Sequence, residues 1–165
     1  MAFLGKSKRA VQQFPTPEEL YLSNTLPRTK TAVDSLWLHQ GDVIRAYAED
    51  HQNTSDLALE LPTGTGKTLP GLLIGEWVRR KRTGTVIYAT PTKQLARQVA
   101  MAAEREGVPA VLLIGSAIYW DPADEASVEG YEAIGITTYS AIFNSSPKVP
   151  ESRLLIFDDA HAGEQ

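Results

Sequence analysis

The sequence contains no cysteine. This absence excludes a disulfide framework, a zinc ribbon and a thiol nucleophile, and it agrees with the cytoplasmic location that we expect. Long apolar runs are also missing, because the longest one, around residues 69–78, is interrupted by one proline, two glycines and a glutamate. Such a run is too short to cross a bilayer. The first 14 residues lack the apolar stretch of a secretory signal, and we expect no contact with a membrane.

Positive charge is scarce as well. Lysine and arginine total 16 against 20 aspartates and glutamates, which gives a net charge of −4. A protein that grips duplex DNA mainly through its electrostatic field is basic, so this balance argues against a simple basic binding module. A motor that holds a strand through a few amides and hydroxyls remains possible. We expect the basic run Arg79–Arg82 to complement a helix dipole rather than to bind DNA.

The order of apolar segments predicts an α/β fold. Residues 1–34 form an N-terminal lead-in with a short helix from Pro17 to about Asn24, signalled by Thr16 as N-cap. Compact apolar strands then alternate with helices, a pattern typical of a parallel sheet. The expected helices are 35–50, 66–82 and 92–106, and the expected strands are 57–61, 85–89, 110–114, 134–137 and 154–157. For residues 115–133 we predict only a long connection.

One glycine-rich segment predicts a phosphate-binding loop. It lies between the expected strand 57–61 and the expected helix 66–82, where successive backbone amides and a helix N-terminus can bind a phosphate. Lys67 would reach the β- and γ-phosphates of ATP, and the Thr68 hydroxyl would bind Mg²⁺. A chance glycine-rich turn is the alternative, because Leu61 stands where the strict pattern has glycine. The loop residues are Thr63, Gly64, Thr65, Gly66, Lys67 and Thr68.

Two carboxylates follow the last expected strand. Ligands bind at the carboxyl ends of strands in open α/β sheets, so Asp158 would hold the Mg²⁺. Asp159 would orient or deprotonate the attacking water. An Asp-Asp pair after a strand can also be a turn and a helix cap, but this one follows the phosphate loop by about ninety residues.

In order and spacing, these segments resemble the DEAD/DEAH-box helicases of superfamily two. Residues 62–68 look like motif I, 91–98 like motif Ia, 115–116 like the short glycine motif, 137–142 like motif Ic and 158–161 like motif II. The resemblance implies that Gln40 reads adenine and that His161 takes part in coupling. It also implies that DNA or RNA lies along Pro91, Thr92, Gly115, Thr137 and Thr138, where hydroxyls and loop amides bind phosphates.

Some of these residues have a structural alternative. Thr92 can be a helix cap, Thr137 can be an ordinary strand residue, and Gln40 can be a solvated helix residue. One departure from the family is that Asp159 replaces the usual glutamate and is one methylene shorter.

The resemblance covers residues 35–165 and implies an incomplete first RecA-like domain, truncated after motif II. In the family, the strand that carries motif III lies between the motif I and motif II strands, and a second RecA-like domain supplies an arginine finger. We therefore expect an ATP-dependent helicase or translocase that needs a second domain. A small-molecule kinase and a module that binds ATP without cleaving it are the two alternatives.

Overall fold

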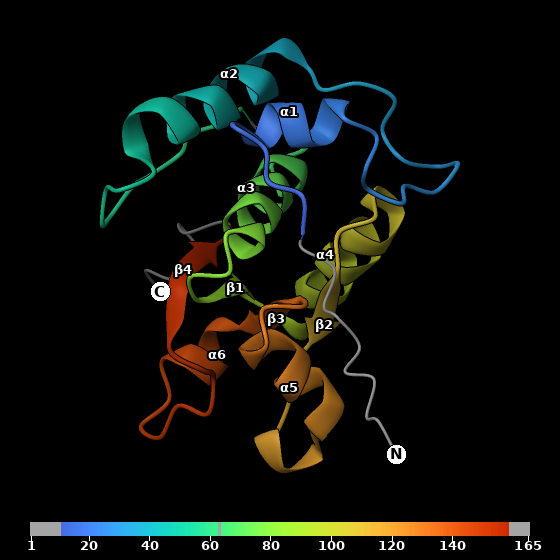
Figure 1. The fold of residues 1–165 in the computed structure, drawn as a ribbon. Helices are drawn as coiled ribbons and strands as arrows, with labels where there is room; N and C mark the ends of the chain where they lie inside the picture. Colours follow the sequence, from blue (N-terminus) through green and yellow to red (C-terminus); the bar gives the residue numbers. More distant parts are fainter. Residues whose placement is uncertain (1–10, 63, 159–165) are drawn as a thin grey trace, which may run out of the picture.

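The computed structural model describes residues 11–62 and 64–158, and its centre is a parallel sheet of four strands (Figure 1). The strand order is β2-β3-β1-β4, and every pairing is parallel. This confirms the predicted α/β class. The strands are β1 (Thr85–Thr90), β2 (Ala110–Leu112), β3 (Ile134–Thr138) and β4 (Ser152–Phe157).

Helices cover both faces of the sheet. On one face α3 and α4 pack against the strands, and α1 and α2 pack on α3 (Figure 1). The other face is covered by α5, and a short helix, α6, follows β3. The helices are α1 (Pro17–Leu22), α2 (Leu38–Ala46), α3 (Thr68–Arg80), α4 (Lys93–Glu106), α5 (Pro122–Glu129) and α6 (Tyr139–Ile142). A π-helical turn, Tyr47–His51, continues α2.

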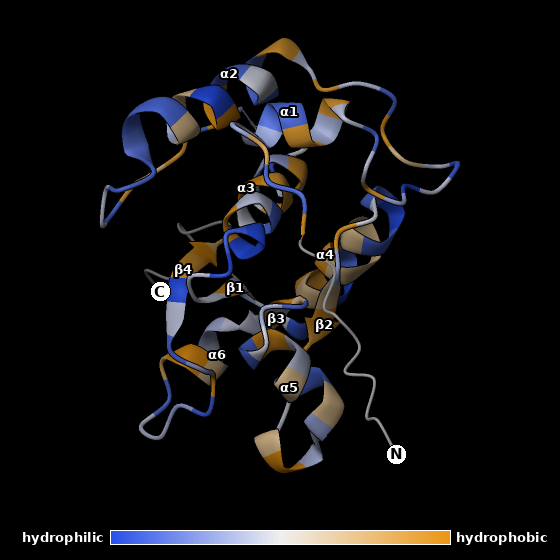
Figure 2. Ribbon diagram, in the orientation of Figure 1, coloured by the Kyte–Doolittle hydropathy of each residue, from blue (hydrophilic) through white to orange (hydrophobic). Residues whose placement is uncertain are grey.

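The core is divided by the sheet, because successive strand residues point to opposite faces. Val86 and Tyr88 of β1 belong to the cluster under α3 and α4, and Ile87 belongs to the cluster that includes Val128 of α5. Figure 2 shows hydrophobic residues in β2 and the end of β4, and hydrophilic ones in the turn after α2. The central strands β1 and β3 are buried along their whole length. The edge strand β2 is half-buried, and the edge strand β4 is half-buried except at Arg153 and Phe157, which are exposed.

The sequence predicted several helix ends through their capping residues. Thr16 caps α1 by accepting a hydrogen bond from the Glu19 amide at 3.1 Å, and Thr92 caps α4 by accepting one from the Leu95 amide at 3.2 Å. Gly107 ends α4 in the left-handed region, with φ of 72°, a conformation that glycine adopts at many helix C-termini.

The predicted strand 57–61 is wrong, because these residues have no regular secondary structure. Leu57 and Leu59 are 37% and 43% exposed. A segment becomes a strand only when a neighbour accepts its backbone hydrogen bonds. β1 already pairs with β3 and β4, and the part of the chain that the structure describes places no strand next to β4 on its other side.

The connection 115–133 contains more structure than the sequence analysis assigned. A 3-10 turn, Ala117–Tyr119, precedes α5, and the Trp120 indole fixes this turn by donating to the Ile114 carbonyl at 3.1 Å. Asp121 caps α5, whose first residue is Pro122. This is the same cap-and-proline signal that identified α1, so α5 was predictable.

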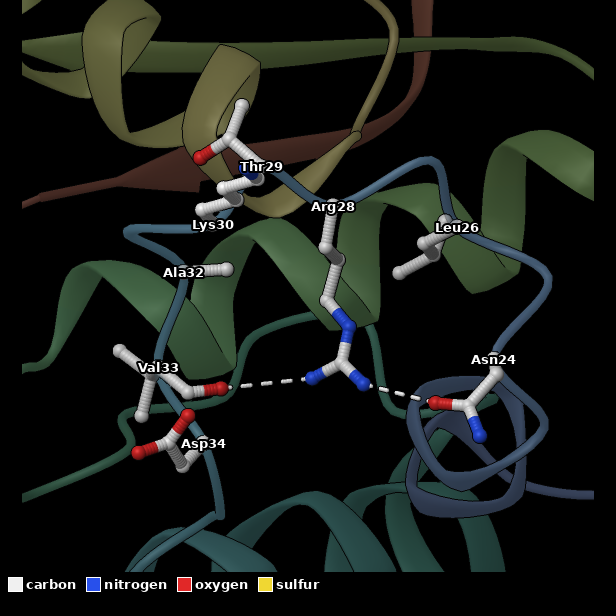
Figure 3. Close-up of a pocket in the computed structure, with 8 residues that line it drawn as sticks. All are labelled: Asn24, Leu26, Arg28, Thr29, Lys30, Ala32, Val33 and Asp34. Carbon is white, nitrogen blue, oxygen red and sulfur yellow. Dashed lines mark hydrogen bonds between the residues drawn. The ribbon is translucent and has the colours of Figure 1, made fainter.

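The lead-in packs on the domain. Its residues Leu20, Tyr21 and Leu26 belong to the main core, and Thr29 donates its amide to the Arg105 carbonyl at 2.9 Å. Figure 3 shows the loop around Arg28, whose guanidinium donates to Asn24 Oδ1 at 2.8 Å and to the Val33 carbonyl at 3.3 Å. This loop borders an open surface pocket of about 370 Å³ that none of the predicted site residues lines. Among the described residues, no helix is both long and apolar enough to span a membrane.

Candidate nucleotide and nucleic-acid site

The predicted phosphate loop leads into the first turn of α3. Gly64 and Gly66 have φ of 80° and 68°, a region that only glycine adopts without strain. The Thr65 hydroxyl donates to the Pro62 carbonyl at 2.6 Å and closes the loop. Lys67 directly precedes the first helical residue, Thr68, and is exposed. The loop thus has the curled backbone and the helix N-terminus that bind phosphate.

Gln40 of α2 is hydrogen-bonded to this loop. Its side-chain nitrogen donates to the carbonyls of Thr65 and Gly66, at 2.8 and 3.1 Å. Its side-chain oxygen accepts from the Trp37 amide at 3.0 Å. Gln40 is 4% exposed, so it is not a solvated helix residue. In this conformation both ends of its amide bind the protein.

Thr68 and Asp158, which are ninety residues apart in the sequence, meet at one buried phenol. The Tyr88 side chain of β1 lies close enough to the Asp158 carboxylate and to the Thr68 hydroxyl for both to affect its pKa. Burial, and then the charge of Asp158, raise the pKa of Tyr88 well above its ordinary value, so the phenol keeps its proton at neutral pH. Tyr88 was not among the predicted site residues. Its only signal in the sequence was a phenol in the middle of a buried strand.

Thr68 and Asp158 suit magnesium. They offer a hydroxyl and a carboxylate, which are hard oxygen donors of the kind that Mg²⁺ prefers. The described part of the chain holds no cluster of three or more histidines, cysteines and acidic residues that could bind a metal. Mg²⁺ commonly takes one or two protein carboxylates and completes its shell with water and substrate phosphates.

The backbone of Asp158 is held independently of its side chain. Its amide donates to the Ala89 carbonyl of β1 at 2.9 Å, and its carbonyl accepts a hydrogen bond from the Tyr139 hydroxyl. Tyr139 begins α6, directly after β3. The backbone of Asp158 is therefore held by the end of β1 and by the first residue of α6, which follows β3.

The predicted nucleic-acid residues gather at the carboxyl end of the sheet. Thr137 and Thr138 of β3 pair with Ala89 and Thr90 of β1. The buried Thr90 hydroxyl lies 2.9 Å from the Thr92 carbonyl and 3.3 Å from the Thr137 carbonyl. Pro91 and Thr92 follow β1, and Gly115 follows β2 with φ of 79°. Thr90 is a second residue that was not among the predicted site residues. Its contacts join two of the segments that are predicted to bind nucleic acid.

The predicted nucleic-acid residues differ in how accessible they are to solvent. Thr92 and Gly115 are exposed, and Pro91 is half-buried. Thr137 is fully buried, and its hydroxyl donates to the Leu113 carbonyl at 2.6 Å. Thr138 is 4% exposed and shares a hydrogen bond with the Ser140 hydroxyl at 3.0 Å. The accessible groups are therefore those of residues 91, 92 and 115.

The basic run at the end of α3 is engaged in contacts within the chain. Arg79 and Arg80 both pair with the buried carboxylate of Glu76, each at 2.7 Å. Lys81 lies over the Trp77 ring, and Arg82 donates to the Gly130 carbonyl at 2.8 Å. These contacts support the structural interpretation of the run.

Three predicted site residues, Thr63, Asp159 and His161, lie outside the described residues. Their assignments remain predictions from the sequence.

The comparisons with known proteins give one match. The family model described as DEAD/DEAH box helicase matches residues 38–165, which include the phosphate loop, the carboxyl ends of the strands and Asp158. No curated protein matches the chain, and no solved structure does.

Proposed function

Because the chain belongs to the DEAD/DEAH box helicase family, we propose that it is the motor domain of an ATP-dependent helicase or translocase. It binds Mg²⁺ and ATP at residues 63–68 and moves along, or unwinds, a strand of DNA or RNA. The observation that carries this proposal is the meeting of Thr68 and Asp158 at the Tyr88 phenol, next to a phosphate loop. One residue of the segment that resembles motif I and one residue of the segment that resembles motif II therefore lie beside the same side chain, Tyr88.

In this proposal the loop residues bind the triphosphate. The loop amides and Lys67 hold the phosphates, while Thr68 and Asp158 bind the magnesium ion, which neutralises charge on the β- and γ-phosphates. Asp159 orients the attacking water. Gln40 couples the loop to α2 through its hydrogen bonds to Thr65 and Gly66.

The nucleic acid lies along the carboxyl end of the sheet. Thr92 and Gly115 expose a hydroxyl and backbone amides that can bind phosphates without reading bases. The buried Thr137 and Thr138 position these loops, and His161 couples the nucleotide and nucleic-acid sites. Catalysis needs a second RecA-like domain, because an arginine finger contributes roughly 10³–10⁵ in rate to phosphoryl transfer of this type.

The first experiment measures ATP binding by calorimetry with and without Mg²⁺, in the wild type and in Lys67→Ala. We expect magnesium-dependent binding in the wild type and its loss in the variant. An unchanged ATP affinity in Lys67→Ala would show that the phosphate loop is wrongly assigned.

A second experiment separates the motor from a small-molecule kinase. Single-stranded DNA and RNA are titrated at several salt concentrations, and ATP hydrolysis is followed with and without them. We expect weak binding with a shallow salt dependence, because the chain is acidic and contacts few phosphates. ATP hydrolysis that neither nucleic acid stimulates, in a form of the protein that does turn over ATP, would favour the kinase.

A further inference from the structure

Tyr88 is buried between a strand and the helix that carries the phosphate loop. It is 1% exposed and lies in β1, the strand between β3 and β4. Its ring packs against Gly71 of α3, where an added Cβ would lie 2.9 Å from Cε2 and 3.2 Å from the phenol oxygen. Gly71 thus gives the ring room beneath the first turn of α3.

The phenol connects three elements. Tyr88 belongs to β1, the Thr68 hydroxyl comes from α3, and the Asp158 carboxylate follows β4. The Asp158 backbone is held by Ala89 and Tyr139. Tyr88 lies opposite Ile156 of β4, two residues before Asp158, so its phenol is placed to restrict the orientation of the Asp158 side chain.

Resting on the function proposed above, we infer that Tyr88 is a positioning residue that orients Thr68 and Asp158 for the divalent cation. A carboxylate that accepts one hydrogen bond from a fixed phenol keeps further lone pairs for a cation. The phenol itself acts as an outer-shell partner, and loss of such partners typically lowers metal affinity by about 10- to 100-fold.

The test compares Tyr88→Phe with the wild type. This substitution keeps the ring packed against Gly71 and removes only the hydroxyl. ATP binding is measured by calorimetry over a series of Mg²⁺ concentrations and again in EDTA. We expect the Mg²⁺ concentration for half-maximal enhancement of binding to rise roughly 10- to 100-fold, while the affinity for ATP in EDTA stays the same.

Tyr21→Phe is the matched control. It removes another buried phenol hydroxyl, one that donates to the Val33 carbonyl at 2.5 Å in the lead-in. Its magnesium dependence should equal that of the wild type. An unchanged magnesium dependence in Tyr88→Phe overturns the inference. So does an equal loss of affinity with and without Mg²⁺, because that result shows a purely structural role.

A second variant decides the matter if Tyr88→Phe does not fold. Gly71→Ala raises helix propensity but pushes the Tyr88 ring, so it should reproduce the magnesium defect while α3 remains intact. Wild-type magnesium dependence in a folded Gly71→Ala then overturns the inference. If the wild type binds no ATP at any Mg²⁺ concentration, the proposed function itself fails, which is a different result.

Discussion

The side-chain amide of Gln40 donates a hydrogen bond to the carbonyl oxygen of Gly66, 3.1 Å away. This bond joins α2 to the phosphate loop across 26 residues of sequence. The carbonyls of Thr65 and Gly66 face the glutamine, and the Thr65 amide donates to the Pro62 carbonyl at 3.3 Å. Gln40 therefore contributes to the shape of the loop whether or not it also contacts a base.

The first prediction concerns Gln40→Glu. A carboxylate cannot donate to the carbonyls of Thr65 and Gly66, and its charge repels them. Leaving buried polar groups without partners costs about 1–3 kcal/mol, so we expect ATP affinity to fall roughly five- to hundredfold by calorimetry. Gln98→Glu, at an exposed position of α4, introduces the same charge and should have little effect. Equal losses in the two variants would contradict the role of Gln40.

The second prediction concerns the loop glycines. Alanine at Gly66 must adopt φ of 68°, and its Cβ would lie 3.0 Å from Gln40 Nε2. Alanine at Gly64 must adopt φ of 80° but meets no atom within 4 Å. The left-handed conformation costs about 1–2 kcal/mol at either position, so Gly66→Ala should weaken ATP binding more than Gly64→Ala.

A double-mutant cycle tests the origin of that difference. In a Gln40→Ala background the contact with the glutamine side chain no longer exists. The excess penalty of Gly66→Ala over Gly64→Ala should then disappear. If it persists, the contact with Gln40 does not explain it.

Most of the site was predictable from local sequence signals. The glycines and Gly-Lys-Thr sequence of the loop, the Thr92 cap and the apolar strands depend on neighbouring residues and on periodicity. Parallel topology then carries Thr92, Thr138 and Asp158 to the same end of the sheet, because all parallel strands finish at one edge.

Features that depend on distant partners were not predictable in the same way. The segment 57–61 has the composition of a strand, but strand formation depends on a neighbour, and the described residues provide none at the free edge of β4. Similarly, Tyr88 looks like an ordinary strand residue until α3 and β4 bring Thr68 and Asp158 to its hydroxyl. Tertiary contacts, rather than local propensity, decide both cases.

The third prediction concerns alkaline pH. Tyr47 is 8% exposed, packs edge-on against Trp77, and has a pKa raised above 10.0 by burial, partly offset by the charge of Arg153. Above about pH 10, the ordinary value, the unfolded chain loses this proton while the folded chain retains it. The free energy of unfolding therefore falls as pH rises through this range.

Tyr47→Phe should make that fall less steep in urea denaturation between about pH 9 and 11. Tyr21 also has a raised pKa and adds to the fall in both proteins. Lys81, whose pKa is lowered by burial, acts in the opposite direction and largely cancels in the comparison. Identical pH slopes in the two proteins would rule out the buried phenol of Tyr47 as a cause.

The fourth prediction concerns the buried carboxylate of Glu76. It is fully buried, pairs with Arg79 and Arg80 at 2.7 Å, and lies on the helix that begins at the phosphate loop. Removing one partner of a buried ion pair leaves uncompensated charge and costs about 3–5 kcal/mol. Glu76→Ala should therefore lower the free energy of unfolding by that amount in urea denaturation.

Two further variants separate charge from packing. Glu104→Ala, at an exposed position of α4, should change stability by no more than about 0.5 kcal/mol. Glu76→Gln keeps the size and acceptor oxygen but not the charge, so its loss should be smaller than that of Glu76→Ala. If Glu76→Gln is as damaging as Glu76→Ala, the ionic contacts with the two arginines are what stabilise α3. If Glu76→Ala is as mild as Glu104→Ala, the buried pair adds little, and the arginines find other partners when the carboxylate is removed.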